Sequence, residues 1–271
     1  MEQSLAASLA VRAHFRKPNV RALFQPDPGY MLVDADLSGA DSQVVFAEAG
    51  EWDTVERLKA GVKLHAETAI GFWGERFTAA AGDTKNPATP KGKMYADMKG
   101  ASHGTTYGAG GRTIAQNRGW PLAEGERFRR FWFAAHPGIR EWQNRVELEL
   151  RETRSTSNRF GYRIHWFDRI DGILPEALAW GPQSSVGITT FRAAEQVRLQ
   201  FPFVQFLIQV HDSLVFQIPE SEALQLPQIA LALEVAIEYS ARSLVIPWKL
   251  AVSRRSWGEC AAWNPGEEIA T

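Results

Sequence analysis

The sequence predicts an α+β fold, in which two strand regions far apart in the chain enclose a long, mainly helical segment. Residues 30–36 form an apolar run with an acidic end, which is typical of a buried strand that reaches the surface. Residues 205–218 give the strongest hairpin pattern in the chain, centred on the sequence VHDS. Between these regions, apolar residues recur largely at helical spacing.

Local patterns predict the other elements. They are helices over residues 52–74, 122–135, 139–153 and 182–200, a mobile loop over 78–93, a hairpin or turn over 158–166, a helix after the main hairpin, and a final strand near 250–253.

The composition excludes several classes of protein. The 271 residues include 30 basic and 31 acidic side chains, so the protein is no polycation and any nucleic-acid groove must be a local basic patch. The single cysteine, Cys260, excludes an internal disulfide, and we interpret it as a packing residue of a cytoplasmic protein. Residues 5–11 lack the features of a signal peptide, and no apolar window is long enough to span a membrane.

Two carboxylates are candidates for a metal site. Asp36 and Asp212 each lie where an apolar strand meets a turn, a position from which a rigid scaffold can present an oxygen ligand to a divalent cation. Acidic residues at strand ends are often plain turn residues, and Asp34 and Asp41 are rivals in the first segment.

Lys99, His103 and Tyr107 form a second constellation. On a helix, their four-residue spacing places them within an arc of about 80° and along about 12 Å, which suits a nucleoside triphosphate. An ordinary exposed stripe is the alternative. Glycines recur at the same interval, at Gly100, Gly104 and Gly108, so a glycine-rich loop is a further alternative.

Other common motifs are missing from the sequence. It contains no GxxxxGKS or GxxxxGKT phosphate loop, no complete dinucleotide fingerprint and no GxSxG elbow. His65, His136 and His165 are isolated, and we interpret each as a surface histidine or a satisfied core histidine.

Four segments together resemble the palm and fingers motifs of family A DNA polymerases, the DNA polymerase I type. In order, they are LVDADLSGADSQVV, KGASHGTTYGAGG, GPQSSVGITTF and LIQVHDSLVFQI, and the similarity runs over residues 21–257. It is closest to short members encoded by tailed bacteriophages. The resemblance implies a palm, an antiparallel sheet with packed helices, formed by residues 20–60 and 176–271. It also implies a mainly helical fingers insertion over 61–175 and an N-terminal extension over 1–19.

The resemblance implies roles for individual residues. Asp36, Asp212 and the backbone carbonyl of Leu37 would hold two Mg²⁺ ions, which Mn²⁺ can replace. Ser213 stands where a second, less essential acid often follows the catalytic aspartate. The residues implied to bind the nucleotide are Lys99, His103 and Tyr107, and those implied to contact DNA are His211, Gln183 and Arg163.

Three departures from the family pattern concern the nucleotide. Asp41 replaces the usual glutamate that excludes a ribose 2′-hydroxyl, so we expect looser sugar discrimination. His103 replaces a phenylalanine or tyrosine of the sugar pocket. Tyr95 replaces a phosphate-binding arginine, a role for which Lys91 and Lys93 are the candidate substitutes.

The resemblance implies a DNA polymerase core that adds deoxynucleotides to a primer 3′ end on a DNA template. Only about twenty residues precede the first motif, so we expect no thumb or exonuclease domain in this chain and a separate protein that supplies the grip on DNA. A single-subunit RNA polymerase or primase-like enzyme is an alternative, against which Asp41 argues. An inactive accessory replisome subunit is another.

Overall fold

The computed structural model describes residues 19–264. The expectation of an N-terminal extension without a signal peptide falls on residues 1–18, outside the described residues. Within residues 19–264, no helix has the length and apolar character needed to cross a bilayer.

The described chain forms two compact units. Unit 1 comprises residues 19–36, Ala194–Leu233 and 248–264, and unit 2 comprises Leu37–Ala193 and Glu234–Pro247. The division into palm and fingers, with boundaries at 60/61 and 175/176, stays a prediction.

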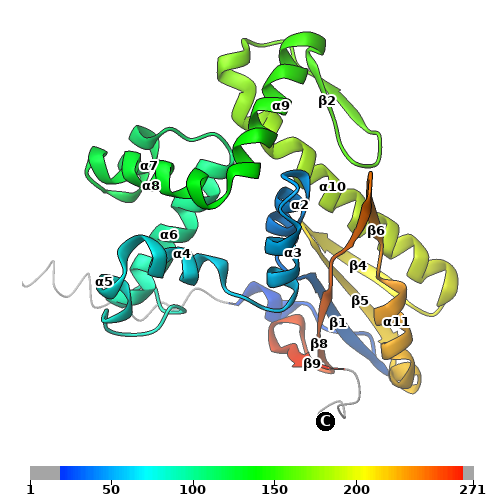
Figure 1. The fold of residues 1–271 in the computed structure, drawn as a ribbon. Coiled ribbons are helices and arrows are strands. Elements are labelled where there is room, and N and C mark those ends of the chain that lie inside the picture. The colour runs from blue at the N-terminus through cyan, green and yellow to red at the C-terminus, as the bar shows by residue number, and fades with distance from the viewer. Residues whose placement is uncertain (1–18, 265–271) are drawn as a thin grey trace, which may run out of the picture. The chain divides into compact units, whose positions relative to one another are not determined.

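Unit 1 contains a five-stranded sheet with the strand order β4-β5-β1-β8-β9 (Figure 1). Its strands are β1 (Tyr30–Leu37), β4 (Gln205–Val210), β5 (Ser213–Pro219), β8 (Trp248–Ser253) and β9 (Ala261–Trp263). One short helical segment, η1 (Val20–Leu23), precedes the strands, and three others lie between them: η2 (Glu220–Gln225), α11 (Leu226–Ala232) and η3 (Trp257–Glu259). The predicted first strand, main hairpin and strand near 250–253 are therefore confirmed, and β9 follows the last of them instead of the chain having its final strand there.

The centre of this sheet is apolar on one face throughout. Met31, Val33 and Ala35 of β1 are fully buried, and Phe216 and Ile218 of the paired strand β5 are equally buried. Successive residues of a strand point to opposite faces, so Asp34 and Asp36 share the other face. The buried apolar face therefore holds the β1 backbone in place, and Asp34 and Asp36 project from its opposite face.

Unit 2 is mainly helical. Its helices are α2 (Ala40–Glu48), α3 (Trp52–Lys59), α4 (Leu64–Trp73), α5 (Glu75–Thr78), α6 (Pro90–Thr106), α7 (Gly111–Arg118), α8 (Leu122–Ala135) and α9 (Pro137–Thr153). Two antiparallel hairpins accompany them, β2 (Ser155–Ser157) with β3 (Arg163–His165) and β6 (Ala236–Tyr239) with β7 (Arg242–Val245). A long helix, α10 (Ile170–Gln200), begins in unit 2 and ends in unit 1.

Several predicted boundaries are wrong for local reasons. Thr89 caps α6 by accepting a hydrogen bond from the Gly92 N–H, and Pro90 opens the helix, so the predicted loop ends at residue 89. The helix placed at 182–200 begins at Ile170, because Pro182 lies inside α10 instead of opening it. The stretch predicted to be helical over 52–74 contains two helices, α3 and α4.

Candidate functional site

Asp36 lies next to the end of β1, on the solvent-accessible part of the sheet. It stands directly opposite Ser213 in the antiparallel β1–β5 ladder. Leu37 is the last residue of β1, so its backbone carbonyl follows Asp36 at the strand end. The ladder thus places Asp36 beside the turn that precedes β5.

Asp212 lies in that turn. Val210 pairs with Ser213, so His211 and Asp212 form a two-residue connection between β4 and β5. His211 has a φ of 54°, a left-handed conformation that two-residue hairpin turns require and that histidine tolerates better than most side chains. The turn and the ladder together bring Asp212 and Asp36 to one end of the sheet.

The charges at this end of the sheet favour a bound cation. Burial raises the pKa of Asp36, and the negative charges of Asp212 and Asp34 raise it further, against the opposing effect of Lys249 and Arg21. A divalent cation would relieve this repulsion, and carboxylate oxygens are its preferred ligands. Within residues 19–264, no group of three or more His, Cys, Asp or Glu side chains could hold a metal ion. Two carboxylates, Asp36 and Asp212, are therefore the side-chain oxygen donors that this end of the sheet offers to a cation.

Asp34, the rival of Asp36, has a structural role. Its carboxylate accepts a hydrogen bond from the indole Nε1 of Trp257 at 2.7 Å and another from Ser213 Oγ at 3.5 Å. Trp257 packs with Leu32 and Val215 on the same face of the sheet, and Cys260 packs against this cluster. Burial raises the pKa of the Cys260 thiol to about 12, which agrees with the interpretation of Cys260 as a packing residue.

The second group of candidates lies on α6 of unit 2. Lys99 and His103 lie within the helix and Tyr107 is its C-cap residue, so the helical alternative is confirmed and a glycine-rich loop is excluded for Gly100 and Gly104. Lys99 and His103 are exposed, whereas Tyr107 is buried. One face of α6 therefore presents a cation and two rings in the predicted order.

Two lysines proposed as substitutes for the missing arginine have other partners. Lys93 forms an ion pair with Asp97 at 2.6 Å, and Lys91 Nζ donates a hydrogen bond to the Thr78 carbonyl at 3.1 Å. Tyr95 contacts the ring of His65 edge-on, with the ring centroids 6.2 Å apart. Binding of phosphate by Lys93 would thus compete with an existing ion pair.

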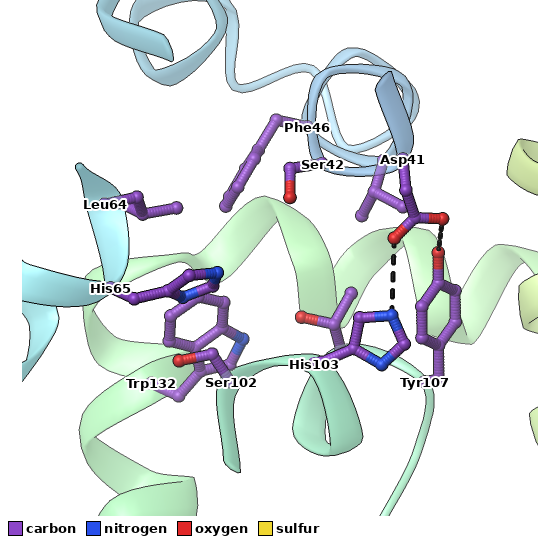
Figure 2. A pocket seen from close by; sticks show the side chains of 11 residues that line it. Asp41, Ser42, Phe46, Leu64, His65, Ser102, His103, Tyr107 and Trp132 are labelled. Atoms are coloured by element: carbon purple, nitrogen blue, oxygen red, sulfur yellow. Dashed lines mark hydrogen bonds and ion pairs between the residues drawn. The ribbon is translucent and has the colours of Figure 1, made fainter. Parts of the chain in front are cut away.

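Asp41 connects the two rings of this group. Its carboxylate accepts a hydrogen bond from the Tyr107 hydroxyl at 2.5 Å, and its other oxygen lies 3.5 Å from His103 Nε2 (Figure 2). Burial raises the pKa of Tyr107, and the charge and hydrogen bond of Asp41 raise it further, so the phenol stays protonated and donates. Asp41, a rival of Asp36 in the first motif, thus contacts two of the nucleotide-binding candidates of α6.

A small cavity continues from these residues toward α4 and α8. It has a volume of about 20 Å³ and is lined by His65, Ser102 and Trp132 as well as by Asp41 and His103 (Figure 2). Among the described residues, the buried atoms His65 Nδ1, Ser102 Oγ and Trp132 Nε1 have no hydrogen-bond partner. Three unpaired polar atoms of the described chain therefore belong to residues that line this cavity.

His65 differs in part from the interpretation as a surface or satisfied core histidine, because its side chain is half-buried and its Nδ1 has no hydrogen-bond partner among the described residues. Burial lowers its pKa to about 4, with further contributions from the charges of Lys99 and His103. Nothing in the local spacing signalled this position, because α4 reaches the cavity only through the tertiary fold. The interpretation is confirmed for His136, which is buried and bonded to Glu51 at 2.7 Å, and for His165, which is exposed.

The three predicted DNA contacts are all exposed. His211 lies in the hairpin turn of unit 1, Gln183 lies on α10, and Arg163 lies on β3, where its Nε donates to Ser157 Oγ at 3.2 Å. Their exposure is compatible with binding a duplex, and their roles stay predictions.

Relatives in sequence and structure point to one family. The chain is 26% identical over 251 residues to the thermostable DNA polymerase I of Thermus filiformis, covering 89% of this chain and 28% of that protein. It is 26% identical over 205 residues to the DNA polymerase of Mycobacterium phage D29, covering 75% and 31%. Its fold matches the POL domain of Pol1 from M. smegmatis, solved in complex with DNA primer-template and dNTP, with a TM-score of 0.72, 21% identity and coverage of 89% and 42%. The resemblance to family A DNA polymerases is confirmed.

The similarity to family A is partial in length. The chain spans less than a third of the length of the two curated relatives described above. No protein-family model matches the chain. The fold class, an α+β polymerase domain with an antiparallel sheet, is confirmed by the structural match.

Proposed function

We propose that the chain is the catalytic part of a DNA-directed DNA polymerase, which adds deoxynucleotides to a primer 3′ end on a DNA template. The observation that carries the proposal is the pairing of β1 with β5, which places Asp36 opposite Ser213 and beside Asp212. Similarity to DNA polymerases over 89% of the chain supports it.

Asp36, Asp212 and the Leu37 carbonyl would hold two Mg²⁺ ions, for which Mn²⁺ can substitute. When bound, such ions neutralise phosphate charge and lower the pKa of the primer hydroxyl. Asp36 and Asp212 keep their carboxylates on a rigid strand end and turn, so little reorganisation is needed to bind the cations. His211 would contact the primer end.

Lys99 would neutralise the triphosphate, and Tyr107 would help to position the template base. Asp41 and His103 would border the sugar, with Asp41 held by the Tyr107 hydroxyl. Gln183 and Arg163 would contact the duplex. A partner protein that supplies the grip on DNA, and a cytoplasmic location, stay predictions.

Primer extension tests this proposal. Wild type, Asp36→Ala, Asp212→Ala and a control variant, Asp53→Ala, would be compared with Mg²⁺ or Mn²⁺ and with deoxynucleotides or ribonucleotides. Asp53 is an exposed carboxylate in the first turn of α3, so its loss should leave activity unchanged. We expect both active-site variants to lose at least about a thousandfold in rate. Equal use of ribonucleotides would favour the RNA polymerase alternative, and a wild type that is inactive both with and without its neighbour proteins would refute the proposal.

A further inference from the structure

Gln143 connects α9 to the C-terminal end of α6. Its side-chain Nε2 donates hydrogen bonds to the backbone carbonyls of Thr105 and Thr106, each at 2.8 Å. The last carbonyls of a helix have no partner within the helix, so a donor from a neighbouring helix fixes the position of the helix end. Gln143 is almost completely buried, with 4% of its surface exposed.

The orientation of the Gln143 amide is also fixed. Its Oε1 accepts a hydrogen bond from Arg140 Nη1 at 3.3 Å, one turn earlier on α9. A flipped amide would point Oε1 at two carbonyl oxygens and lose all three hydrogen bonds. The amide therefore acts as a donor to α6 in one orientation.

The end of α6 is the point from which Tyr107 leaves the helix. Its ring lies edge-on to Trp142, the neighbour of Gln143 on α9, with the centroids 6.4 Å apart. The Tyr107 hydroxyl in turn holds Asp41 at 2.5 Å. A continuous path of contacts therefore runs from Gln143 through Tyr107 to Asp41.

We propose that Gln143 is a positioning residue, which sets the place of Tyr107 and, through it, of the Asp41 carboxylate at the sugar of the incoming nucleotide. This inference rests on the proposed polymerase function. Replacing the amide with an apolar side chain removes this donor from the Thr106 carbonyl and leaves the Thr105 carbonyl with the Gly108 N–H at 3.1 Å, which favours a shift or fraying of the helix end.

The test compares Gln143→Met with Gln217→Met. Gln217 is equally buried and also donates two hydrogen bonds, to Asp27 Oδ2 at 2.7 Å and to Gln205 Oε1 at 2.8 Å, but it lies in the sheet of unit 1. Each variant thus loses a buried amide that donates two hydrogen bonds and accepts one, and only Gln143 bonds to α6.

For Gln143→Met we expect the KM for the deoxynucleotide to rise about tenfold and the preference for deoxynucleotides over ribonucleotides to fall by a similar factor. Gln217→Met should leave both quantities within about twofold. An unchanged KM and preference in Gln143→Met, or equal changes in both variants, would overturn the proposal.

Hydrogen exchange of backbone amides tests the position of the α6 end without an activity measurement. The amides of Tyr107, Gly108 and Ala109 bond to the last carbonyls of α6, and they should exchange at least about fivefold faster in Gln143→Met than in wild type. If that variant does not fold, Arg140→Met, which changes an exposed side chain, should accelerate the same amides to a smaller extent. Unaltered exchange in every folded variant would contradict the positioning role of Gln143, whereas an inactive wild type would contradict only the polymerase function.

Discussion

Asparagine substitutions at Asp34 and Asp36 should have opposite effects on stability and on metal use. Both side chains lie on one face of β1, two residues apart. Asp34 is bonded to the Trp257 indole at 2.7 Å, with 18% of its side chain exposed, whereas no hydrogen bond or ion pair from the described residues is observed at the Asp36 carboxylate. Asp34 is therefore expected to serve the fold, and Asp36 the metal.

The expected loss for Asp34→Asn follows from this hydrogen bond. A bond to a charged acceptor contributes about 1.5–3 kcal/mol and a neutral one about 0.5–1.5 kcal/mol, so the asparagine should cost about 1 kcal/mol. Arg21, 3.9 Å away and exposed, adds little. For a chain of this length the loss corresponds to a fall in Tm of about 2–4 °C. Metal-dependent extension should be retained.

Asp36→Asn should instead raise the stability of the protein and abolish its metal-dependent extension. It removes a carboxylate whose ionisation is disfavoured by burial and by two neighbouring negative charges, so the metal-free protein should become more stable at neutral pH. Metal-dependent extension should be lost. Urea unfolding without metal and primer extension over a Mn²⁺ titration measure the two effects. The reasoning fails if Asp34→Asn abolishes metal-dependent extension or if Asp36→Asn retains it.

Three other changes have defined outcomes. Because the pKa of Asp36 is raised in the folded state, its protonated form stabilises the fold at low pH, and this contribution is lost as the pH rises through the raised pKa. In urea unfolding without metal, the stability of Asp36→Asn relative to wild type should therefore grow with pH. A difference that is constant with pH would exclude the raised pKa of Asp36 as its cause. Tyr107→Phe removes the hydrogen-bond donor to the partly exposed Asp41, so it should lower the free energy of unfolding by about 1 kcal/mol and reduce discrimination against ribonucleotides in primer extension. Unchanged discrimination would argue against a role of the Tyr107 hydroxyl in the sugar pocket. His211→Val places a β-branched residue at a φ of 54° and should lower the free energy of unfolding by about 1–2 kcal/mol, whereas His211→Gly should be as stable as wild type. Equal stabilities of the two variants in thermal unfolding would count against backbone strain at this turn.

The sequence predicted the elements whose signals are local. The strand at 30–36 and the hairpin at 205–218 are predicted by apolar runs that end in polar turn residues. The helix at 122–135 has the predicted bounds because the sequence HPG ends it. The β6–β7 hairpin was missed because its turn, Ser240 and Ala241, contains no glycine, asparagine or aspartate.

The site was predictable in its residues and not in its contacts. Motif order identifies Asp36, Asp212 and the α6 series, because each motif is a short continuous segment. Gln143 and the carbonyls that it bonds are 37 and 38 positions apart, and no periodicity links them. Such contacts depend on how helices pack, which only the folded chain reveals.

The β1–β5 ladder has a consequence for how this chain can diverge. Backbone hydrogen bonds and a two-residue turn set the separation of Asp36 and Asp212, so exchanges among apolar side chains on the buried face of the ladder leave it unaltered. A single inserted residue in β5 between Ser213 and Phe216 would instead move every later side chain to the opposite face. The separation of the two carboxylates therefore tolerates exchanges of apolar side chains in this sheet far better than a change in the length of its strands.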